Sequence, residues 1–203
     1  MNGIDLVLAS ASPRRRELLR AAGVAFSVEP ADVDEDLNAF SDPEVAAVEL
    51  ALRKARAAVA VRQRASAAVV LGADTIVAVQ RDGRWSLLGK PVDSEDALRM
   101  LGLLSGTRHL VVTGVALVRT SDGAQRTGVE RTFVTMREIA AAERAAYVAS
   151  GEWQGKAGGY AIQETADRFV ERLEQGGFDN VVGLPVALVL RLLEELAPET
   201  PAS

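Results

Sequence analysis

Residues 10–16 hold the side chains best suited to bind an anion, in the order Ser-Ala-Ser-Pro-Arg-Arg-Arg. Ser12 is a good N-cap and Pro13 suits the first helical position, so a helix is expected to begin at Pro13. Arginines in a first turn are repelled by the partial positive charge of the helix N-terminus unless an anion lies among them. The free N–H groups, the serine hydroxyls and the guanidinium groups together favour phosphate as that anion. A solvated arginine cluster is the structural alternative.

Asp74 is the second candidate, because it follows the most apolar run of the chain, residues 67–73. This run predicts a buried central strand, and open α/β sheets bind their ligands at the carboxyl ends of such strands. A carboxylate there can hold a metal, act as a general base toward water, or do both. An aspartate that caps a turn through Thr75 is the alternative, and the residues alone leave both open.

Further polar side chains could contribute to a site, and each has a structural alternative. Glu35 lies in an acidic loop in which composition does not distinguish it from its neighbours. Lys54 lies in a predicted helix and Lys90 in a Gly-Lys-Pro loop; lysine suits phosphate oxygens, yet most lysines are surface residues. Gln163 has a planar amide that can pair with a base edge. His109 is expected to be a hydrogen-bonded structural residue, because no serine or cysteine nucleophile matches it.

Composition narrows the classes of function. The 203 residues are 48% apolar and 25% charged, which suits one domain with an ordinary buried core. A net charge of −5 makes nonspecific nucleic-acid binding a poor hypothesis. With no cysteine and one histidine, any metal should be Mg²⁺ or Mn²⁺ held by carboxylates. No signal-like N-terminus and no apolar run of about 18 residues is present, so a cytoplasmic protein without membrane contact is expected.

The elements that must position these side chains follow from periodicity and turn residues. Strands are predicted over residues 4–9, 25–28, 67–79, 110–118 and 128–136. Helices are predicted over residues 13–22, 43–62, 94–104, 140–149 and 186–196, with a loop over 179–185. Ser41 and Glu44 can form a capping box for the second helix. Hairpin turns at Asp82-Gly83 and at residues 121–123 make the middle of the sheet antiparallel. The predicted fold class is therefore α/β, with a mixed twisted sheet flanked by helices.

A series of motifs, taken in order, resembles the Maf family over nearly the whole chain. The motifs are residues 10–19, 49–55, 72–77, 89–91, 104–106 with His109, 113–115, 156–160 and 181–185. Proteins of this family are nucleoside triphosphate pyrophosphatases, linked historically to septum formation. The resemblance implies a single domain over residues 1–197, with two lobes around a cleft as in the inosine triphosphate pyrophosphatases, and a flexible tail over residues 198–203. A homodimer is the family expectation.

The resemblance also implies a reaction and a role for each candidate residue. The reaction is cleavage of a nucleotide between its α and β phosphates, assisted by Mg²⁺ or Mn²⁺, to give a monophosphate and pyrophosphate. The implied phosphate-binding set is Ser10, Arg14, Arg15, Lys54 and Lys90. Asp74 resembles the catalytic carboxylate, and Glu35 its acidic partner near the metal. Gly-Ala-Asp-Thr together with Tyr-x-Ile-Gln resembles the branch that prefers dTTP and UTP, which makes Thr75 and Gln163 specificity contacts.

The chain departs from the family pattern directly after Gln163. Residues 164–167 read Glu-Thr-Ala-Asp where glycines are usual, and residues 175–178 read Gln-Gly-Gly-Phe in place of a short Gly-Asp stretch. These changes concern the loop over the base, so they bear on base preference more than on chemistry, and modified pyrimidine nucleotides stay open as substrates. The alternative function is a nucleotide-binding regulator of cell division with little turnover. The carboxylates argue against it, because a pure binder needs no group that activates water.

Overall fold

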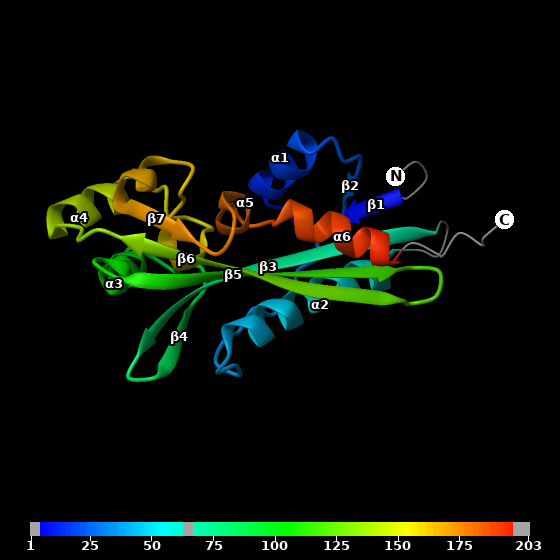
Figure 1. Ribbon diagram of the computed structural model, residues 1–203, viewed down its shortest axis with the longest axis horizontal. Coiled ribbons are helices and arrows are strands. Elements are labelled where there is room, and N and C mark those ends of the chain that lie inside the picture. The colour runs from blue at the N-terminus through cyan, green and yellow to red at the C-terminus, as the bar shows by residue number, and fades with distance from the viewer. Residues whose placement is uncertain (1–4, 63–66, 197–203) are drawn as a thin grey trace.

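A mixed seven-stranded sheet forms the centre of the molecule (Figure 1). The computed structural model describes residues 5–62 and 67–196. The strands are β1 (Asp5–Leu8), β2 (Ser27–Val28), β3 (Ala68–Arg81), β4 (Arg84–Leu88), β5 (Arg108–Arg119), β6 (Gln125–Met136) and β7 (Val170–Glu174). Their order is β2-β1-β3-β5-β6-β7, and β4 pairs with the far part of β3. β1 runs parallel to β2 and β3, and all other pairs are antiparallel. The predicted mixed α/β class is confirmed.

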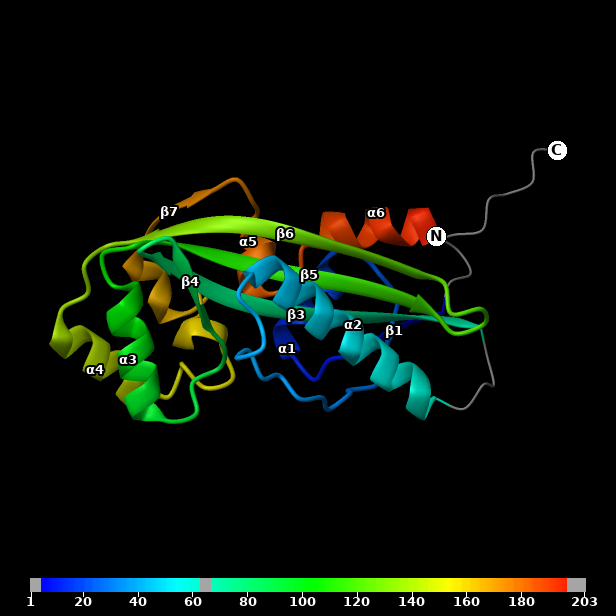
Figure 2. The ribbon, with the colours of Figure 1, turned by 90° about the horizontal axis from the view of Figure 1, so that it is seen from below.

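Helices cover both faces of this sheet (Figures 1 and 2). They are α1 (Pro13–Ala21), α2 (Pro43–Val61), α3 (Ser94–Leu104), α4 (Ala141–Ser150), α5 (Phe178–Val182) and α6 (Val186–Leu196), with 3₁₀ turns η1 (Ala157–Gly159) and η2 (Thr165–Phe169). α2 lies on one face, while α1 and α6 lie on the other. Successive residues of a strand point to opposite faces. Leu71 and Ala73 of β3 accordingly pack with the leucines of α6, while Val70 packs with the alanines of α2.

Two glycines let α2 approach the sheet closely. A Cβ atom on Gly72 would lie 2.1 Å from the carbonyl oxygen of Ala51, and one on Gly114 would lie 2.2 Å from that of Ala47. No side chain fits at such distances, so the backbone of α2 rests directly on β3 and β5. This contact fixes the height of α2 over the sheet, and with it the position of every side chain that α2 presents there.

β3 has a stretch that lacks a strand on one side. β1 pairs with β3 only as far as Leu8 opposite Leu71, and the pairing with β4 begins at Val77. Within the described ranges, residues 72–76 therefore have β5 as their sole strand neighbour. The chain leaves β1 at this point and enters α1, so the gap lies beside the start of that helix.

The structure corrects several predicted boundaries. The strand predicted over residues 67–79 is β3, which runs on to Arg81, so Asp74 lies within a strand that remains paired with β5 on both sides of it. The capping box at Ser41 is wrong, since Asp42 directly precedes Pro43 and accepts bonds from the backbone N–H groups of Glu44 and Val45.

Two segments differ in type from the prediction. Residues 178–182, which overlap the predicted loop over 179–185, form the short helix α5, and β7 was not predicted at all. Both elements are only five residues long, which is too short for a repeating apolar pattern to identify a helix or a strand. β2 is also shorter than predicted. The last helix has the predicted bounds, and Ser12 caps its helix as expected.

Across the described parts of the chain, the structure contains no helix with the length and apolar character needed to traverse a membrane. Ile4 of the first predicted strand and the tail predicted over residues 198–203 lie outside the described residues.

Candidate active site

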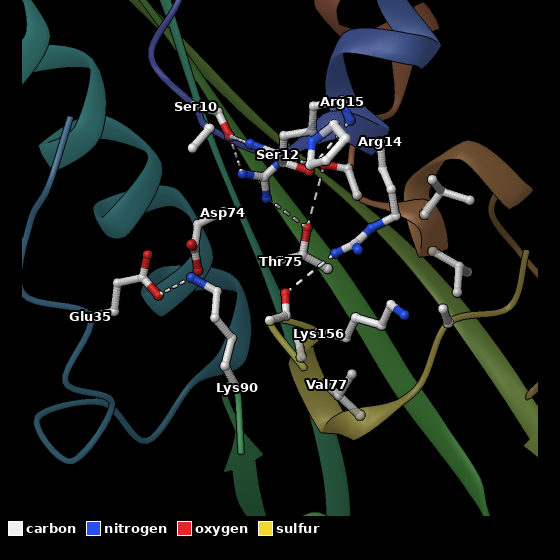
Figure 3. Close-up of a pocket in the computed structure, with 18 of the residues that line it drawn as sticks. Ser10, Ser12, Arg14, Arg15, Glu35, Asp74, Thr75, Val77, Lys90 and Lys156 are labelled. Carbon is white, nitrogen blue, oxygen red and sulfur yellow. Dashed lines mark hydrogen bonds and ion pairs between the residues drawn. The ribbon is translucent and has the colours of Figure 1, made fainter. Parts of the chain in front are cut away.

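A cavity of about 490 Å³ opens beside the stretch of β3 that lacks a strand neighbour on one side (Figure 3). Its walls come from the loop between β1 and α1, the acidic loop, α2, β3, the segment around η1 and the end of α5. All the side chains predicted for the site line it, namely Ser10, Arg14, Arg15, Glu35, Lys54, Asp74, Thr75, Lys90 and Gln163. Segments far apart in the sequence thus meet at one place, as the motifs required.

The guanidinium group of Arg15 is held from three sides at the start of α1. Its Nη1 donates to Ser10 Oγ at 3.2 Å, its Nη2 to Thr75 Oγ1 at 3.2 Å, and its Nε to the carbonyl oxygen of Gly183 at 2.8 Å. Ser12 caps the helix by accepting a hydrogen bond from the backbone N–H of Arg15. The predicted helix start is confirmed, and it delivers a fixed planar cation to the cavity.

The arginines of this corner have no carboxylate partner within the part of the chain that the structure describes. Burial lowers the pKa of Arg15, although the charge of Asp74 opposes this. Arginine nevertheless stays protonated in proteins, so the positive charge lies partly desolvated and unpaired. Arg14 lines the cavity and donates to the carbonyl oxygen of Gly155, whereas Arg16 does not line the cavity. The cavity therefore offers two of the three arginines to an anion.

Lys54 joins two carboxylates on the opposite wall. Its Nζ donates to Asp74 Oδ1 and lies 2.6 Å from Glu35 Oε1. The second carboxylate oxygen of Glu35 lies 2.6 Å from Lys90 Nζ (Figure 3). Burial alone would raise the pKa of Glu35, but hydrogen bonds and charge from both lysines lower it to about 2. Glu35 is consequently ionised at neutral pH.

The alternation of β3 explains why the two walls differ. Asp74 lies an even number of residues from Val70, so both side chains point to the same face of β3. This is the face covered by α2, which supplies Lys54. Thr75 points to the same face of β3 as Ala73, which is the face on which α1 lies, and α1 supplies Arg15. The side chains of Lys54 and Asp74 are only 8% and 9% exposed. The free edge of β3 is where groups from both faces reach one cavity.

The carboxylates meet one requirement of a hard divalent cation. Asp74 Oδ1 and Glu35 Oε1 both contact a single nitrogen atom, so they converge on one point. Mg²⁺ is commonly bound by one or two carboxylates together with substrate phosphates. No group of three or more His, Cys, Asp or Glu side chains arranged for a metal occurs in the described residues. The residues therefore fit a metal that arrives with, or is completed by, phosphate oxygens.

The cavity lining also contains apolar side chains and an amide. Val77, Val111 and Val181 are among its apolar residues, and the exposed Gln163 lines it too. The amide of Gln163 makes no hydrogen bond to any described residue. Such a lining can receive the flat face of a base, with the amide free to pair with its edge.

His109 lies outside the cavity lining and is buried. Its Nε2 lies 2.9 Å from the hydroxyl of Tyr160, and burial lowers its pKa to about 3. The ring is neutral at pH 7 and packs edge-on against Tyr160. The prediction of a hydrogen-bonded structural histidine is confirmed.

Three positioning groups of the cavity were not identified from the sequence. Gly183 offers its carbonyl oxygen to Arg15, and Lys156 lies buried in the cavity wall. Asn180 is fully buried, and its backbone carbonyl oxygen accepts a hydrogen bond from the hydroxyl of Thr113. The same hydroxyl oxygen of Thr113 lies 3.0 Å from the hydroxyl oxygen of Thr75. The motifs at 113–115, 156–160 and 181–185 contain these residues, but a motif does not show which backbone oxygen faces a side chain.

Comparison with known proteins identifies the family. The family model described as "Maf-like protein" matches residues 5–196. The chain belongs to this family. A protein of Caulobacter vibrioides named dTTP/UTP pyrophosphatase is 47% identical over 195 residues, which covers 96% of each chain. Proteins of the same name from Gloeobacter violaceus and Bacillus cereus are 45% and 44% identical and cover 95% and 94% of this Maf-like chain, and 96% and 94% of their own.

Proposed function

We propose that this Maf-like protein hydrolyses nucleoside triphosphates between the α and β phosphates, releasing a monophosphate and pyrophosphate. The observation that carries the proposal is the opposition of unpaired arginines to a carboxylate–lysine cluster across one cavity. The names of the Caulobacter, Gloeobacter and Bacillus relatives support the same reaction. A triphosphate is the anion that matches this density of cationic groups.

The chain's own residues suggest how the reaction proceeds. Arg14, Arg15 and Lys90 bind phosphate oxygens and offset the charge that shifts toward the leaving group. Asp74 accepts a proton from the attacking water, whose oxygen forms a bond to the α-phosphorus. The bond from the α-phosphorus to the bridging oxygen breaks, and its electron pair leaves with pyrophosphate. Lys54 orients the carboxylates of Asp74 and Glu35 before the substrate binds.

Glu35 and Asp74 would hold Mg²⁺ or Mn²⁺ together with the phosphate oxygens. Such an ion, when bound, neutralises phosphate charge and polarises the phosphorus centre toward attack. The convergence of the two carboxylates on one nitrogen supports this assignment.

Within this reaction we propose dTTP and UTP as preferred substrates, with modified pyrimidine nucleotides included in the class. The unpaired amide of Gln163 and the apolar residues in the same cavity lining support a base contact there. The hydroxyl of Thr75 is already engaged by Arg15 and Thr113, so its contribution to specificity includes the placement of Arg15. A homodimer and a cytoplasmic location are further expectations, which light scattering and cell fractionation would check.

The decisive experiment measures pyrophosphate release from dTTP, UTP, CTP and ATP with Mg²⁺ or Mn²⁺. Asp74→Asn should lower kcat by about 10²–10⁴-fold, the usual contribution of a general base. Asp32→Asn, an exposed aspartate of the acidic loop outside the cavity lining, is the charge-matched control and should retain activity. Binding of nucleotides by the parent without pyrophosphate release would overturn the proposal in favour of a nucleotide-binding regulator.

A further inference from the structure

The turn that carries Gln163 is short and closed by one backbone hydrogen bond. The N–H of Glu164 donates to the carbonyl oxygen of Ala161 at 3.1 Å. Gln163 is the third residue of this turn, and its side chain is exposed at the cavity wall. A single turn bond does not fix such a side chain, so its position depends on what holds the residues around it.

The two residues after Gln163 are tied to the segment just before η1. Glu164 Oε2 lies 2.6 Å from Lys156 Nζ, which also donates to the carbonyl oxygen of Glu152. The carboxylate of Glu152 accepts hydrogen bonds from both the N–H and the hydroxyl of Thr165, at 3.1 and 2.6 Å. Two adjacent residues thus make three side-chain links to one neighbouring segment.

Burial makes the ionic link stronger than an ordinary surface pair. The side chain of Lys156 is 8% exposed and lies in the cavity wall, while that of Glu164 is 37% exposed (Figure 3). A buried ammonium group that loses its carboxylate is left poorly compensated. Glu164 is therefore held close to Lys156, and the turn before it is held with it.

We propose that Glu152, Lys156, Glu164 and Thr165 form a clamp that positions Gln163 for the base of the nucleotide. The proposal rests on the proposed function, because it takes Gln163 as the base contact. These four are positioning residues. The clamp orders the turn before the substrate binds, so the entropic cost of ordering the turn does not weaken binding of the substrate.

The test compares Glu164→Gln and Thr165→Val with the parent. Each should raise KM for UTP about two- to tenfold, the net worth of one hydrogen bond, while kcat stays within about twofold. Hydrogen exchange at the amides of residues 161–165 should be faster in both variants. Asp167→Asn is the matched control, because this exposed aspartate lies in the same segment and its side chain makes no hydrogen bond or ion pair with any described residue. It should leave both KM and exchange unchanged.

A double-mutant cycle with Gln163→Ala separates this inference from the proposed function. If the clamp acts through Gln163, Glu164→Gln should have no further effect on KM once the amide is absent. Unchanged exchange in Glu164→Gln and Thr165→Val would overturn the clamp, whatever the activity. An equal rise in KM with and without Gln163 would overturn positioning through this residue. Parent-like KM for UTP in Gln163→Ala would instead overturn the base contact of the proposed function.

Discussion

Replacement of Lys54 by methionine should destabilise the protein more than any other single change in the cavity. Within the described chain, Lys54 is the sole polar partner of the Asp74 side chain, and both side chains are less than a tenth exposed. Methionine keeps the volume and the apolar stem of lysine but removes the ammonium group. Asp74 would then be a buried carboxylate without compensation, whereas Glu35 would keep its contact with Lys90.

The expected loss is about 3–5 kcal/mol in the free energy of unfolding at pH 7, the usual cost of breaking a buried ion pair from one side. Part of this loss depends on pH through Glu35. In the parent, Lys54 and Lys90 lower the pKa of Glu35 from 4.5 to about 2, so that stabilisation is present above pH 4.5 and is lost as the pH falls toward 2. The difference between variant and parent should therefore shrink over that pH range. Since Glu35 is partly exposed, this contribution is about 1–2 kcal/mol after solvent screening.

Urea denaturation at a series of pH values, read as the difference between variant and parent, measures the effect. Arg53→Met is the matched control, since Arg53 precedes Lys54 on α2 but makes exposed contacts, an ion pair with Glu49 and a cation–π contact with Phe40. That control should cost less than about 1 kcal/mol. A Lys54→Met loss as small as the control's, or one that grows as the pH falls, would refute the account of a buried and mutually dependent cluster.

Three further predictions concern other parts of the molecule. Because burial lowers the pKa of His109 from 6.5 to about 3, its neutral state stabilises the fold above pH 6.5 and less as the pH falls. The parent should therefore lose about 2 kcal/mol from pH 6.5 to 5 in urea titrations, and His109→Gln should lack this slope. Gly114→Ala should lower stability by at least about 1–3 kcal/mol in thermal melts, because its Cβ would lie 2.2 Å from the backbone oxygen of Ala47; unchanged melting would contradict the close packing of α2. Arg15→Lys should raise KM for UTP at least about tenfold in steady-state assays, because an ammonium group cannot make the three directed bonds of the guanidinium; a parent-like KM would show that charge alone suffices.

The sequence was sufficient for the parts of the site that depend on local chemistry. Ser12, Pro13 and the arginines specify a helix start with an excess of positive charge, and that start is where α1 begins. The hydrophobic run before Asp74 specifies a buried strand, and β3 is that strand. Single-chain patterns report such features because capping and alternation act between near neighbours.

The features that the sequence did not supply depend on contacts between distant segments. Glu35 could not be chosen from its acidic neighbours by composition, whereas in the structure it reaches both Lys54 and Lys90. Asp34 and Asp36 instead accept hydrogen bonds from nearby backbone N–H groups of their own loop. The partner of Asp74 is a further example: a carboxylate within a buried strand is tolerable only because α2 brings an ammonium group to it.

The length of β1 explains why this sheet has a site at all. Asp74 and Thr75 are adjacent, so their side chains point to opposite faces of β3, and in a fully paired sheet they could not share a ligand. β1 stops opposite Leu71 and β4 begins to pair only at Val77, which leaves the edge between them open to both faces. Arg15 reaches Thr75 from one face and Lys54 reaches Asp74 from the other, around that free edge. A one-residue shift in the register of β3 would exchange the faces to which Asp74 and Thr75 point. The register of the strand therefore determines whether each side chain meets its partner.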